Sequence, residues 1–435
     1  MESLWRATSK LPEFPRLEYD LKTDILIIGG GMAGLLCAYY LQQAGADYTL
    51  IEANRLCGGV TADTTAKITY QHGLIYDRLM GEFGAETARL YLEANRAALK
   101  EYARLAKTID CDFARKDHAV YSDDRAALER ELSALERIGT SAIFEEHPAL
   151  PFATQGAVRV KDQAQFHPLK FAAAIAKGLH IYEHTAARAF DGEAILTDRG
   201  GIRARKIIVA THFPIFNKHG RYFLKLYQHR SYALALEGGP TLDAMYVGGG
   251  QDTVSLRNHG DLLLLGGGGH RTGKQGGNWA ELEEFARKHY PKAKIRYRWA
   301  AQDCVSLDGI PYIGQYAKGT PDLYVATGFN KWGMTSSMVA ARLLCDLTRG
   351  KKNPYRAVFD PTRSIWHKQL TTNALETTLH LLKPTAPRCP HLGCALEWNE
   401  QEHSWDCPCH GSRFAEDGKL LNDPATDDLK LKKKP

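Results

Sequence analysis

The feature that most constrains the fold is a glycine-rich turn near the start of the chain. The segment DILIIGGGMAGLLCAYYLQQAG is followed by YTLIEA, a pattern that predicts a strand, a turn, a helix and a second strand. Gly29, Gly31 and Gly34 have G-x-G-x-x-G spacing. The first glycine permits the turn, the second admits a pyrophosphate, and the third lets helix and strand pack closely. We therefore predict a βαβ unit that binds a dinucleotide.

Glu52 supports this prediction because it lies at the end of the second strand, where a carboxylate can bind a ribose hydroxyl pair. The helix N-terminus also offers free N–H groups and a partial positive charge to phosphates. The spacing alone leaves NAD and FAD as alternatives.

Three further stretches bear on that choice: GGVTADTTAKITYQHGL (58–74), VATHFP (209–214) and DGIPYIG…LYVATGFNKWGMTSSM (308–338). Together with the glycine turn they resemble the D-amino-acid-oxidase type of FAD oxidoreductase, over roughly residues 20 to 350. The resemblance implies FAD, with a C-terminal part of the unit closing over the flavin. A helix N-terminus would stabilise the reduced, anionic flavin. Besides the glycine turn and Glu52, the implied FAD-binding residues are Thr61, Thr211, Gly328, Gly333, Met334 and Thr335.

The resemblance also implies oxidation of a C–N bond by hydride transfer, which needs positioning more than an acid–base pair. Members specific for amino acids hold the substrate carboxylate with an arginine just before D-G-x-P-x-I-G. This chain has Gln302 and Asp303 there, which argues against an α-amino acid. Four other residues are candidates for the substrate side, although each is equally compatible with a loop-anchoring role: Lys67, His72, His270 and Arg271.

The last fifty residues hold a second motif, CPHLGC followed by CPCHGS. Cys389-x-His391 and Cys407-x-x-His410 are separated by fifteen residues. Two thiolates and two imidazoles suit either Zn²⁺ or a [2Fe–2S] cluster.

With its two inner cysteines the motif resembles the Rieske motif of the cytochrome-complex type. That resemblance implies that Cys389 and Cys407 hold one iron and His391 and His410 the other. It also implies a disulfide between the inner cysteines, Cys394 and Cys409. Phe414 stands where such proteins usually have a tyrosine that donates to a ligand sulfur, so we expect a lowered reduction potential.

The predicted fold class is α/β: a Rossmann-like FAD-binding domain, an antiparallel-sheet substrate domain and a small all-β Rieske module. We expect an N-terminal arm at 1–23, a linker at 351–386 and the module at 387–435. The FAD-binding domain is assigned 24–80, 151–220 and 300–350, and the substrate domain 81–150 and 221–299.

The composition is that of an ordinary globular protein, with 44% hydrophobic and 24% charged residues among 435. The formal charge of +6 lacks a basic stripe with interleaved aromatics, so we expect no nucleic-acid partner. Neither a secretory signal nor an apolar run of spanning length is visible, which favours a cytoplasmic protein without a membrane span. The five upstream cysteines are expected to be buried thiols.

These features together predict a dehydrogenase that oxidises a small amine or amino-acid-like substrate and relays electrons from FAD through the cluster. The external acceptor would be a protein or quinone-like molecule, and a homo-oligomer is compatible with the sequence. Two alternatives stay open: an O₂-using amine oxidase with a structural cluster, and an electron-transfer protein without small-molecule turnover.

Overall fold

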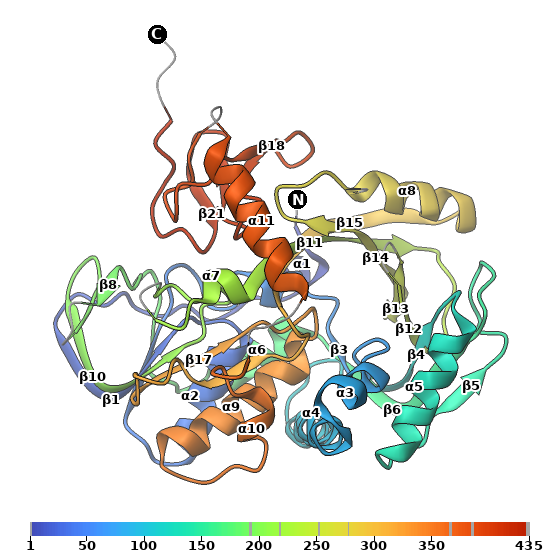
Figure 1. Cartoon of the computed structure of the whole chain (residues 1–435), viewed down its shortest axis with the longest axis horizontal. Helices are drawn as coiled ribbons and strands as arrows, with labels where there is room; N and C mark the ends of the chain where they lie inside the picture. Colours follow the sequence, from blue (N-terminus) through green and yellow to red (C-terminus); the bar gives the residue numbers. More distant parts are fainter. Residues whose placement is uncertain are drawn as a thin grey trace.

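A computed structural model describes residues 2–190, 194–216, 219–250, 253–276, 278–364, 368–383 and 387–431. Its strands form three sheets (Figure 1), of eight, nine and four strands. Within these residues, no helix combines the length and the apolar composition that a membrane crossing requires.

The eight-stranded sheet has the order β16-β17-β10-β1-β2-β7, with β9 beside β10 and β8 beside β9. Its strands are β1 (Leu21–Ile28), β2 (Tyr48–Ile51), β7 (Ile181–Tyr182), β8 (Ala189–Phe190), β9 (Ile195–Leu196), β10 (Gly201–Val209), β16 (Tyr312–Gln315) and β17 (Leu323–Thr327). β1 runs parallel to both β2 and β10, and β10 runs parallel to β17. The carboxyl ends of these four strands therefore meet at one edge, where open α/β sheets bind their ligands.

Two buried helices cover this sheet, α2 (Met32–Gln43) and α9 (Gly333–Thr348). Almost every residue of α9 is buried, which explains why its sequence lacks a polar face. The predicted βαβ unit is thus present as β1, α2 and β2, with a parallel register between the two strands.

The nine-stranded sheet has the order β15-β11-β14-β13-β12-β4-β6-β3, with β5 beside β6. Its strands are β3 (Lys67–Ile68), β4 (Ala114–Tyr121), β5 (Ile143–Glu145), β6 (Ala157–Gln165), β11 (Leu226–Glu237), β12 (Ala244–Gly248), β13 (Ser255–His259), β14 (Leu262–Arg271) and β15 (Lys294–Ser306). All pairings are antiparallel except that of β12 with β4.

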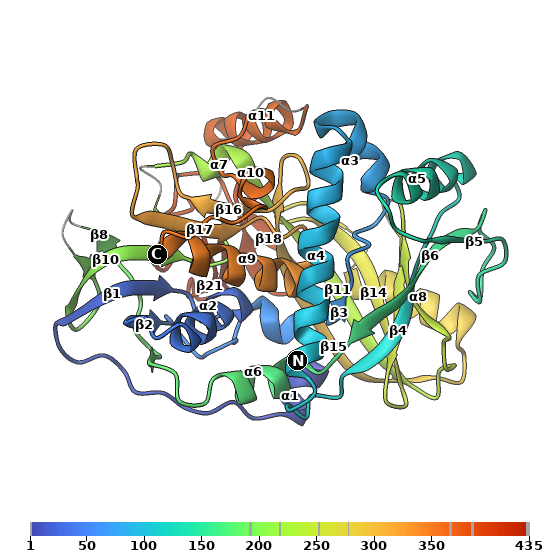
Figure 2. The ribbon, with the colours of Figure 1, turned by 90° about the horizontal axis from the view of Figure 1, so that it is seen from below.

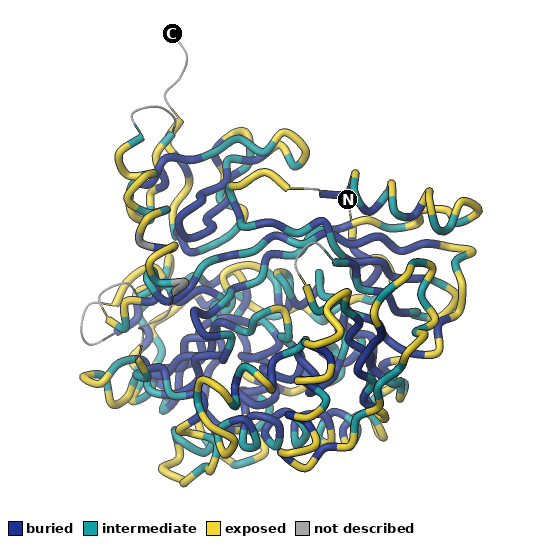
Figure 3. The backbone as a smooth tube through the Cα atoms, turned by 45° about the vertical axis from the view of Figure 1, so that its right-hand side comes forward, coloured by how far each residue is buried: buried dark blue, intermediate teal, exposed yellow. Residues whose placement is uncertain are grey.

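Four helices lie beside this sheet: α3 (Tyr76–Phe83), α4 (Ala85–Leu105), α5 (Arg125–Arg137) and α8 (Asn278–His289). Figure 2 places α4 between the two large sheets, and α4 also contacts α9. The remaining short helices are α1 (Leu4–Thr8), η1 (Val60–Asp63), α6 (Pro168–Ile175), α7 (Tyr222–Lys225) and α10 (Arg356–Phe359). Figure 3 shows buried backbone running through both large sheets, with exposed residues on the outer turns.

The strands are divided between the sheets differently from the expected domain ranges. β6 pairs in the nine-stranded sheet although its range, 151–220, was assigned to the FAD-binding domain. β3 and most of β15 also belong to this sheet although their residues were assigned to the FAD-binding domain. An alternating pattern identifies a strand but carries no information about which sheet it joins. The expected linker, 351–386, contains α10 and the 15-residue helix α11 (Lys368–Leu382).

The C-terminal module is the all-β unit expected from the sequence, an antiparallel sheet in the order β18-β19-β20-β21. Its strands are β18 (Glu397–Asn399), β19 (Ser404–Asp406), β20 (Arg413–Ala415) and β21 (Leu420–Asn422). The module has a separate small core built around its four cysteines, together with Leu396, Phe414, Ala425 and Leu429. α11 lies beside it at the top of Figure 1.

The N-terminal arm anchors the loop that contains η1. Trp5 is fully buried, and its indole N–H donates to the Thr64 carbonyl at 2.6 Å. The guanidinium of Arg257 lies 5.4 Å from the centre of the same ring. Ser3 donates to the Ala62 carbonyl at 2.6 Å, so the arm holds this loop at two points.

We predict that Trp5→Ala lowers the free energy of unfolding by about 3–5 kcal/mol, because a fully buried tryptophan leaves a large cavity. Denaturant unfolding of the purified protein measures the loss. Tyr19→Ala is the control: Tyr19 is 53% exposed, and its removal should cost about 1 kcal/mol or less. Equal losses in the two variants would contradict the anchoring role of the arm.

Candidate functional site

The glycine turn joins β1 to α2 at the edge where the parallel strands end. Gly29 has φ of +107°, and a Cβ there would lie 2.6 Å from the Ala210 carbonyl oxygen. A Cβ on Gly34 would lie 1.9 Å from the Gly29 carbonyl oxygen. Gly31 caps α2 without a side chain of its own. The turn therefore has the close backbone approach that a pyrophosphate site needs.

A cavity of about 1660 Å³ opens from this turn and reaches between the two large sheets. Its size exceeds the roughly 300–1,000 Å³ of pockets for a single drug-sized ligand. Most of the expected FAD-binding residues line it: Gly29, Gly31, Glu52, Thr61, Thr211, Gly328, Gly333 and Met334. The cavity is therefore large enough, and lined by suitable residues, for an extended dinucleotide with further room beside it.

Glu52 is held at the cavity wall by backbone N–H groups. Its carboxylate accepts from Gly30 at 2.7 Å and from Asn54 at 2.9 Å. Burial raises the pKa of Glu52, and these two N–H groups oppose that rise. The carboxylate keeps lone pairs available for a ribose hydroxyl pair.

Thr61 and Thr335 have structural contacts that the sequence did not reveal. The Thr61 hydroxyl accepts from the Met32 N–H at 3.0 Å, so it caps the first turn of α2. Thr335 donates to the Thr69 carbonyl at 3.2 Å and lies 3.0 Å from His72 Nε2. Thr335 is thus committed to the neighbouring loop.

His72 is an anchor whose ring nitrogens both have partners. Nδ1 lies 2.7 Å from the Tyr91 hydroxyl, and Nε2 lies 2.8 Å from the Thr69 carbonyl oxygen. The ring stacks on Trp332 at 4.9 Å. Burial lowers the pKa of His72 to about 3, so the imidazole is neutral at physiological pH. These contacts suit a residue that orders the cavity wall.

Lys67 differs from His72 because its ammonium faces the cavity with only weak partners. It donates to Thr65 Oγ at 3.1 Å and to Ser255 Oγ at 3.4 Å. The fully buried Arg257 lies nearby, and no carboxylate forms an ion pair with Lys67 in the described residues. Burial, with a smaller contribution from Arg257, lowers the pKa of Lys67 to about 7. This part of the cavity suits an anionic group.

His270 and Arg271, at the end of β14, face different neighbours. His270 Nε2 lies 3.0 Å from the Tyr232 hydroxyl, and its Nδ1 lies 2.9 Å from the Arg271 carbonyl oxygen. Arg271 instead reaches the C-terminal module, where it donates to the carbonyls of Pro408 and Cys409 at 3.1 and 3.2 Å. The side chain of Arg271 therefore contacts the loop that contains Cys407 and His410.

Gln302 and Asp303 lie just before the D-G-x-P-x-I-G motif, where family members specific for amino acids have an arginine. Gln302 donates to Gln228 Oε1 at 2.6 Å and to the Gly411 carbonyl at 2.9 Å. Burial raises the pKa of Asp303 to about 6, and Lys331 opposes that rise. Gln302 thus belongs both to the cavity wall and to the contact with the module.

The two loops of the module have matching backbone geometry. In the first cluster loop (389–394), Cys389 N donates to Cys394 O and Gly393 N donates to Cys389 O, both at 2.9 Å. In the second cluster loop (407–412), Cys407 N donates to Ser412 O at 2.8 Å and Gly411 N to Cys407 O at 2.9 Å. Each loop is therefore closed in the same way around its cysteine and histidine.

The four expected ligand residues converge between these loops. The imidazole rings of His391 and His410 lie 5.0 Å apart and nearly perpendicular. Both nitrogens of His410 are buried, and no described residue forms a hydrogen bond with either of them. Burial lowers the pKa of His391 to about 4 and that of His410 to about 3, which keeps both rings in the neutral form that binds metal. This donor set fits a [2Fe–2S] cluster of the Rieske type.

Cys394 and Cys409, the pair for which the sequence predicts a disulfide, are buried next to each other. The sulfur of Cys394 interacts with the sulfurs of both Cys407 and Cys409, and the three sulfurs lie within 4.8 Å of one another. Hydrogen bonds from those two thiols lower the pKa of Cys394 to about 4. Cys394 is thus close to Cys409. All five upstream cysteines are buried, as predicted.

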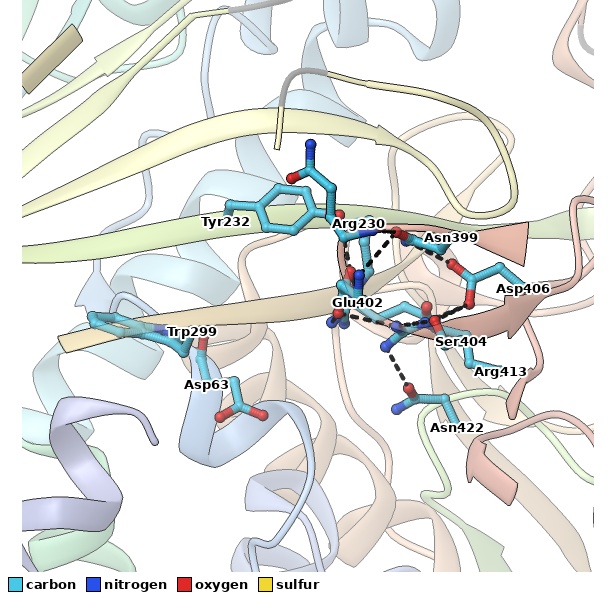
Figure 4. A network of polar contacts seen from close by, with 12 residues as sticks. Asp63, Arg230, Tyr232, Trp299, Asn399, Glu402, Ser404, Asp406, Arg413 and Asn422 are labelled. Carbon is cyan, nitrogen blue, oxygen red and sulfur yellow. Dashed lines mark hydrogen bonds and ion pairs between the residues drawn. The ribbon is translucent and has the colours of Figure 1, made fainter. Parts of the chain in front are cut away.

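A buried ion-pair network also fixes the module to the main body (α1 to α9), as Figure 4 shows. Glu402, from the turn between β18 and β19, pairs with Arg230 of β11 and with Arg413 of β20. The Tyr232 hydroxyl donates to the same carboxylate at 2.9 Å. Burial raises the pKa of Glu402, but the two guanidinium groups outweigh it and lower the value to about 2.

Phe213 completes the contact between the cavity edge and the cluster loops. It follows Thr211 and His212, which line the cavity, and its ring centre lies 6.2 Å from that of His391 and 6.4 Å from that of His410. The backbone N–H of Phe213 donates to Asp423 Oδ2 at 3.4 Å, and burial raises the pKa of Asp423 to about 7. Sequence reasoning missed Glu402 and Asp423, since no local motif marks either residue.

Over residues 24–347 the chain matches the family described as FAD dependent oxidoreductase, and over residues 349–433 it matches the Rieske [2Fe-2S] domain. The chain belongs to the FAD dependent oxidoreductase family. It also carries a Rieske domain, so both resemblances noted in the sequence are confirmed, and its cofactors are FAD and a [2Fe–2S] cluster.

Similar proteins agree with this assignment. The Bacillus subtilis (strain 168) protein YhfW, whose name calls it a Rieske 2Fe-2S iron-sulfur protein, is 35% identical over 496 residues, covering 99% of this chain and 97% of YhfW. Gamma-glutamylputrescine oxidoreductase of Escherichia coli (strain K12) is 24% identical over 395 residues, covering 81% of this chain and 89% of that enzyme. Glycine oxidase from Geobacillus kaustophilus shares the fold, with a TM-score of 0.67 at 20% identity, covering 79% of this chain and 100% of its own.

We predict that Gly34→Ala removes most of the bound flavin, because the new methyl group would collide with the Gly29 carbonyl inside the turn. The flavin absorbance per purified chain measures the loss. Gly81→Ala is a matched control, since Gly81 lies in α3 with no atom within 4 Å of the added methyl group. Full flavin content in Gly34→Ala would contradict the assignment of this turn.

Proposed function

We propose that this protein is a dehydrogenase that oxidises a small amine or amino-acid-like substrate at FAD and passes the electrons to the Rieske cluster. From the cluster they would leave to an external protein or quinone-like acceptor. One observation carries this proposal: Gln302 lines the FAD cavity and also donates to the carbonyl of Gly411, the residue directly after His410. A single side chain therefore separates the cavity from the second cluster loop.

In this proposal Cys389 and Cys407 hold one iron, and His391 and His410 hold the other. Ser412 supports the first pair, because its hydroxyl lies within hydrogen-bonding reach of the Cys389 sulfur. Its oxygen also accepts from the Ala425 N–H at 3.0 Å, which fixes the hydroxyl in place. A disulfide between Cys394 and Cys409 remains part of the proposal, since their sulfurs already lie close together.

The chemistry of the two cofactors is complementary, since FAD accepts two electrons as a hydride and a Rieske cluster carries one at a time. The chain's own residues would bind and orient the substrate. His72, stacked on Trp332, keeps the cavity wall rigid, and Tyr232 with His270 forms another fixed part of it. With these rings committed to partners, catalysis depends on positioning.

Lys67 supports a substrate that carries a carboxylate. Its ammonium faces the cavity, and its described partners are two hydroxyl groups, with Arg257 adding a second positive charge nearby. The name of the relative gamma-glutamylputrescine oxidoreductase fits a substrate that carries both an amine and an acid group. We infer that Lys67 binds the acid group and so orients the C–N bond.

The protonation of Lys67 should make kcat/KM depend on pH. Lys67 binds an anion only when protonated, and with a pKa of about 7 that form dominates below pH 7. For a carboxylate-bearing amine, kcat/KM should therefore fall as the pH rises through about 7. Lys67→Arg should move the fall to higher pH, because a guanidinium stays protonated.

Lys67→Met should lower kcat/KM for that substrate about tenfold or more, since a charged hydrogen bond contributes about 1.5–3 kcal/mol. An amine without a carboxylate serves as the control, because its kcat/KM should not respond to the variant. A pH profile that is the same in the wild type and in Lys67→Arg would refute the role of Lys67.

The relay itself is tested by anaerobic mixing with a panel of amines and amino acids, with absorbance and EPR read together. We expect the flavin band to bleach first and the signal of a reduced Rieske cluster to appear next. Cys407→Ser should lack the cluster signal while its flavin still bleaches. A cluster that stays oxidised while peroxide formation matches turnover would instead identify an O₂-using oxidase with a structural cluster.

A further inference from the structure

The side chain of Arg271 belongs to the main body and contacts the second cluster loop. Its Nε donates to the Pro408 carbonyl at 3.1 Å, and one Nη donates to the Cys409 carbonyl at 3.2 Å. The other Nη donates to Asn373 Oδ1 of α11 at 3.0 Å. All three nitrogens are engaged, and two of them hold the backbone between Cys407 and His410.

The aromatic ring of Tyr227 closes the remaining side, with its centre 5.0 Å from the guanidinium carbon. Close backbone contacts surround the same loop. A Cβ on Gly273, two residues after Arg271, would lie 2.6 Å from Pro408, and a Cβ on Gly411 would lie 2.5 Å from Gln228. The guanidinium therefore lies in a closely packed interface between the main body and the module.

The positive charge of Arg271 is not cancelled by an adjacent acid. In the parts of the chain that the structure describes, no carboxylate lies within ion-pair distance of its guanidinium. The acid that acts on it from farther away, Glu376, pairs with Lys274 at 2.7 Å and lies 3.7 Å from His380. An arginine stays charged even when burial disfavours the charge. One full positive charge thus lies against the backbone of the second cluster loop and interacts electrostatically with Cys407 and Cys409.

We infer that Arg271 is a positioning residue that fixes the second cluster loop and raises the reduction potential of the cluster held there. A nearby positive charge stabilises an added electron, and the effect is strong where water is excluded. The inference rests on the proposed function, because it makes the cluster a better electron acceptor for FAD. Phe414, which lacks the hydroxyl donor found in similar modules, lowers the potential, and Arg271 offsets that loss.

The geometry also explains why this residue is an arginine. Three nitrogens of one planar group reach two carbonyls and one amide oxygen at the same time, which a lysine ammonium on a flexible stem cannot match. Charge and loop position can therefore be separated by mutation. Arg271→Lys keeps the positive charge and loses some of the three hydrogen bonds, whereas Arg271→Gln loses the charge.

The test is an EPR-monitored redox titration of the holoprotein, with the cluster reduced chemically. We expect Arg271→Gln to shift the midpoint potential downward and Arg271→Lys to leave it near the wild-type value. Arg298→Gln is the control, since Arg298 is 45% exposed and pairs with Glu283 away from the loops. An unchanged potential in Arg271→Gln, or equal shifts in the Gln and Lys variants, would overturn the inference.

A second pair of variants covers the case in which Arg271→Gln assembles no cluster. Asn373→Asp places a carboxylate against the guanidinium and leaves Arg271 on the loop, so the potential should again fall. Asn373→Ala, which adds no charge, should shift it less. Equal potentials in these two variants would contradict the electrostatic role of Arg271.

The outcomes also separate this inference from the proposed function. The titration needs neither substrate nor electron transfer from flavin, so a lowered potential supports Arg271 even if substrate never reduces the cluster. If substrate reduces the cluster normally while all Arg271 and Asn373 variants keep the wild-type potential, the relay stands and the role of Arg271 fails.

Discussion

The structure depends on the contact between the second cluster loop and the main body. Arg271 and Gln302 donate hydrogen bonds to three carbonyls of that loop, and Glu402 reaches back to Arg230. The C-terminal module has only a small core built around its four cysteines. A unit with so small a core usually needs a metal, a disulfide or a partner surface for stability. The main body therefore supplies a wall of the metal site as well as the cofactor cavity.

This contact places two redox sites within one fold. The carboxyl ends of β1 and β10 form one edge of the FAD cavity, and the chain leaving β10 carries Phe213 to the rings of His391 and His410. The nine-stranded sheet contributes Lys67, the proposed substrate-binding residue, to the cavity wall and, through Gln302, the contact with the module. In the proposed relay, this contact would let the two-electron FAD and the one-electron cluster exchange electrons within one molecule.

The sequence predicted those parts of the protein that local patterns encode. The glycine turn, Glu52 and the paired Cys and His residues could be proposed as site residues because each depends on spacing within a short segment. The roles of His72 and Arg271 were not predictable, because their partners, Thr335 and the loop carbonyls, lie far away in the chain. The sheet that β6 joins was not predictable for the same reason, since strand pairing is a long-range property.

The central claim is that the docked module and the flavin cavity form one intramolecular unit. The most direct test is the rate constant for cluster reduction after anaerobic mixing with substrate, measured over a wide range of protein concentrations. A docked module predicts a rate constant that does not depend on protein concentration. A rate that rises in proportion to concentration would show that electrons pass between molecules, and would contradict the account.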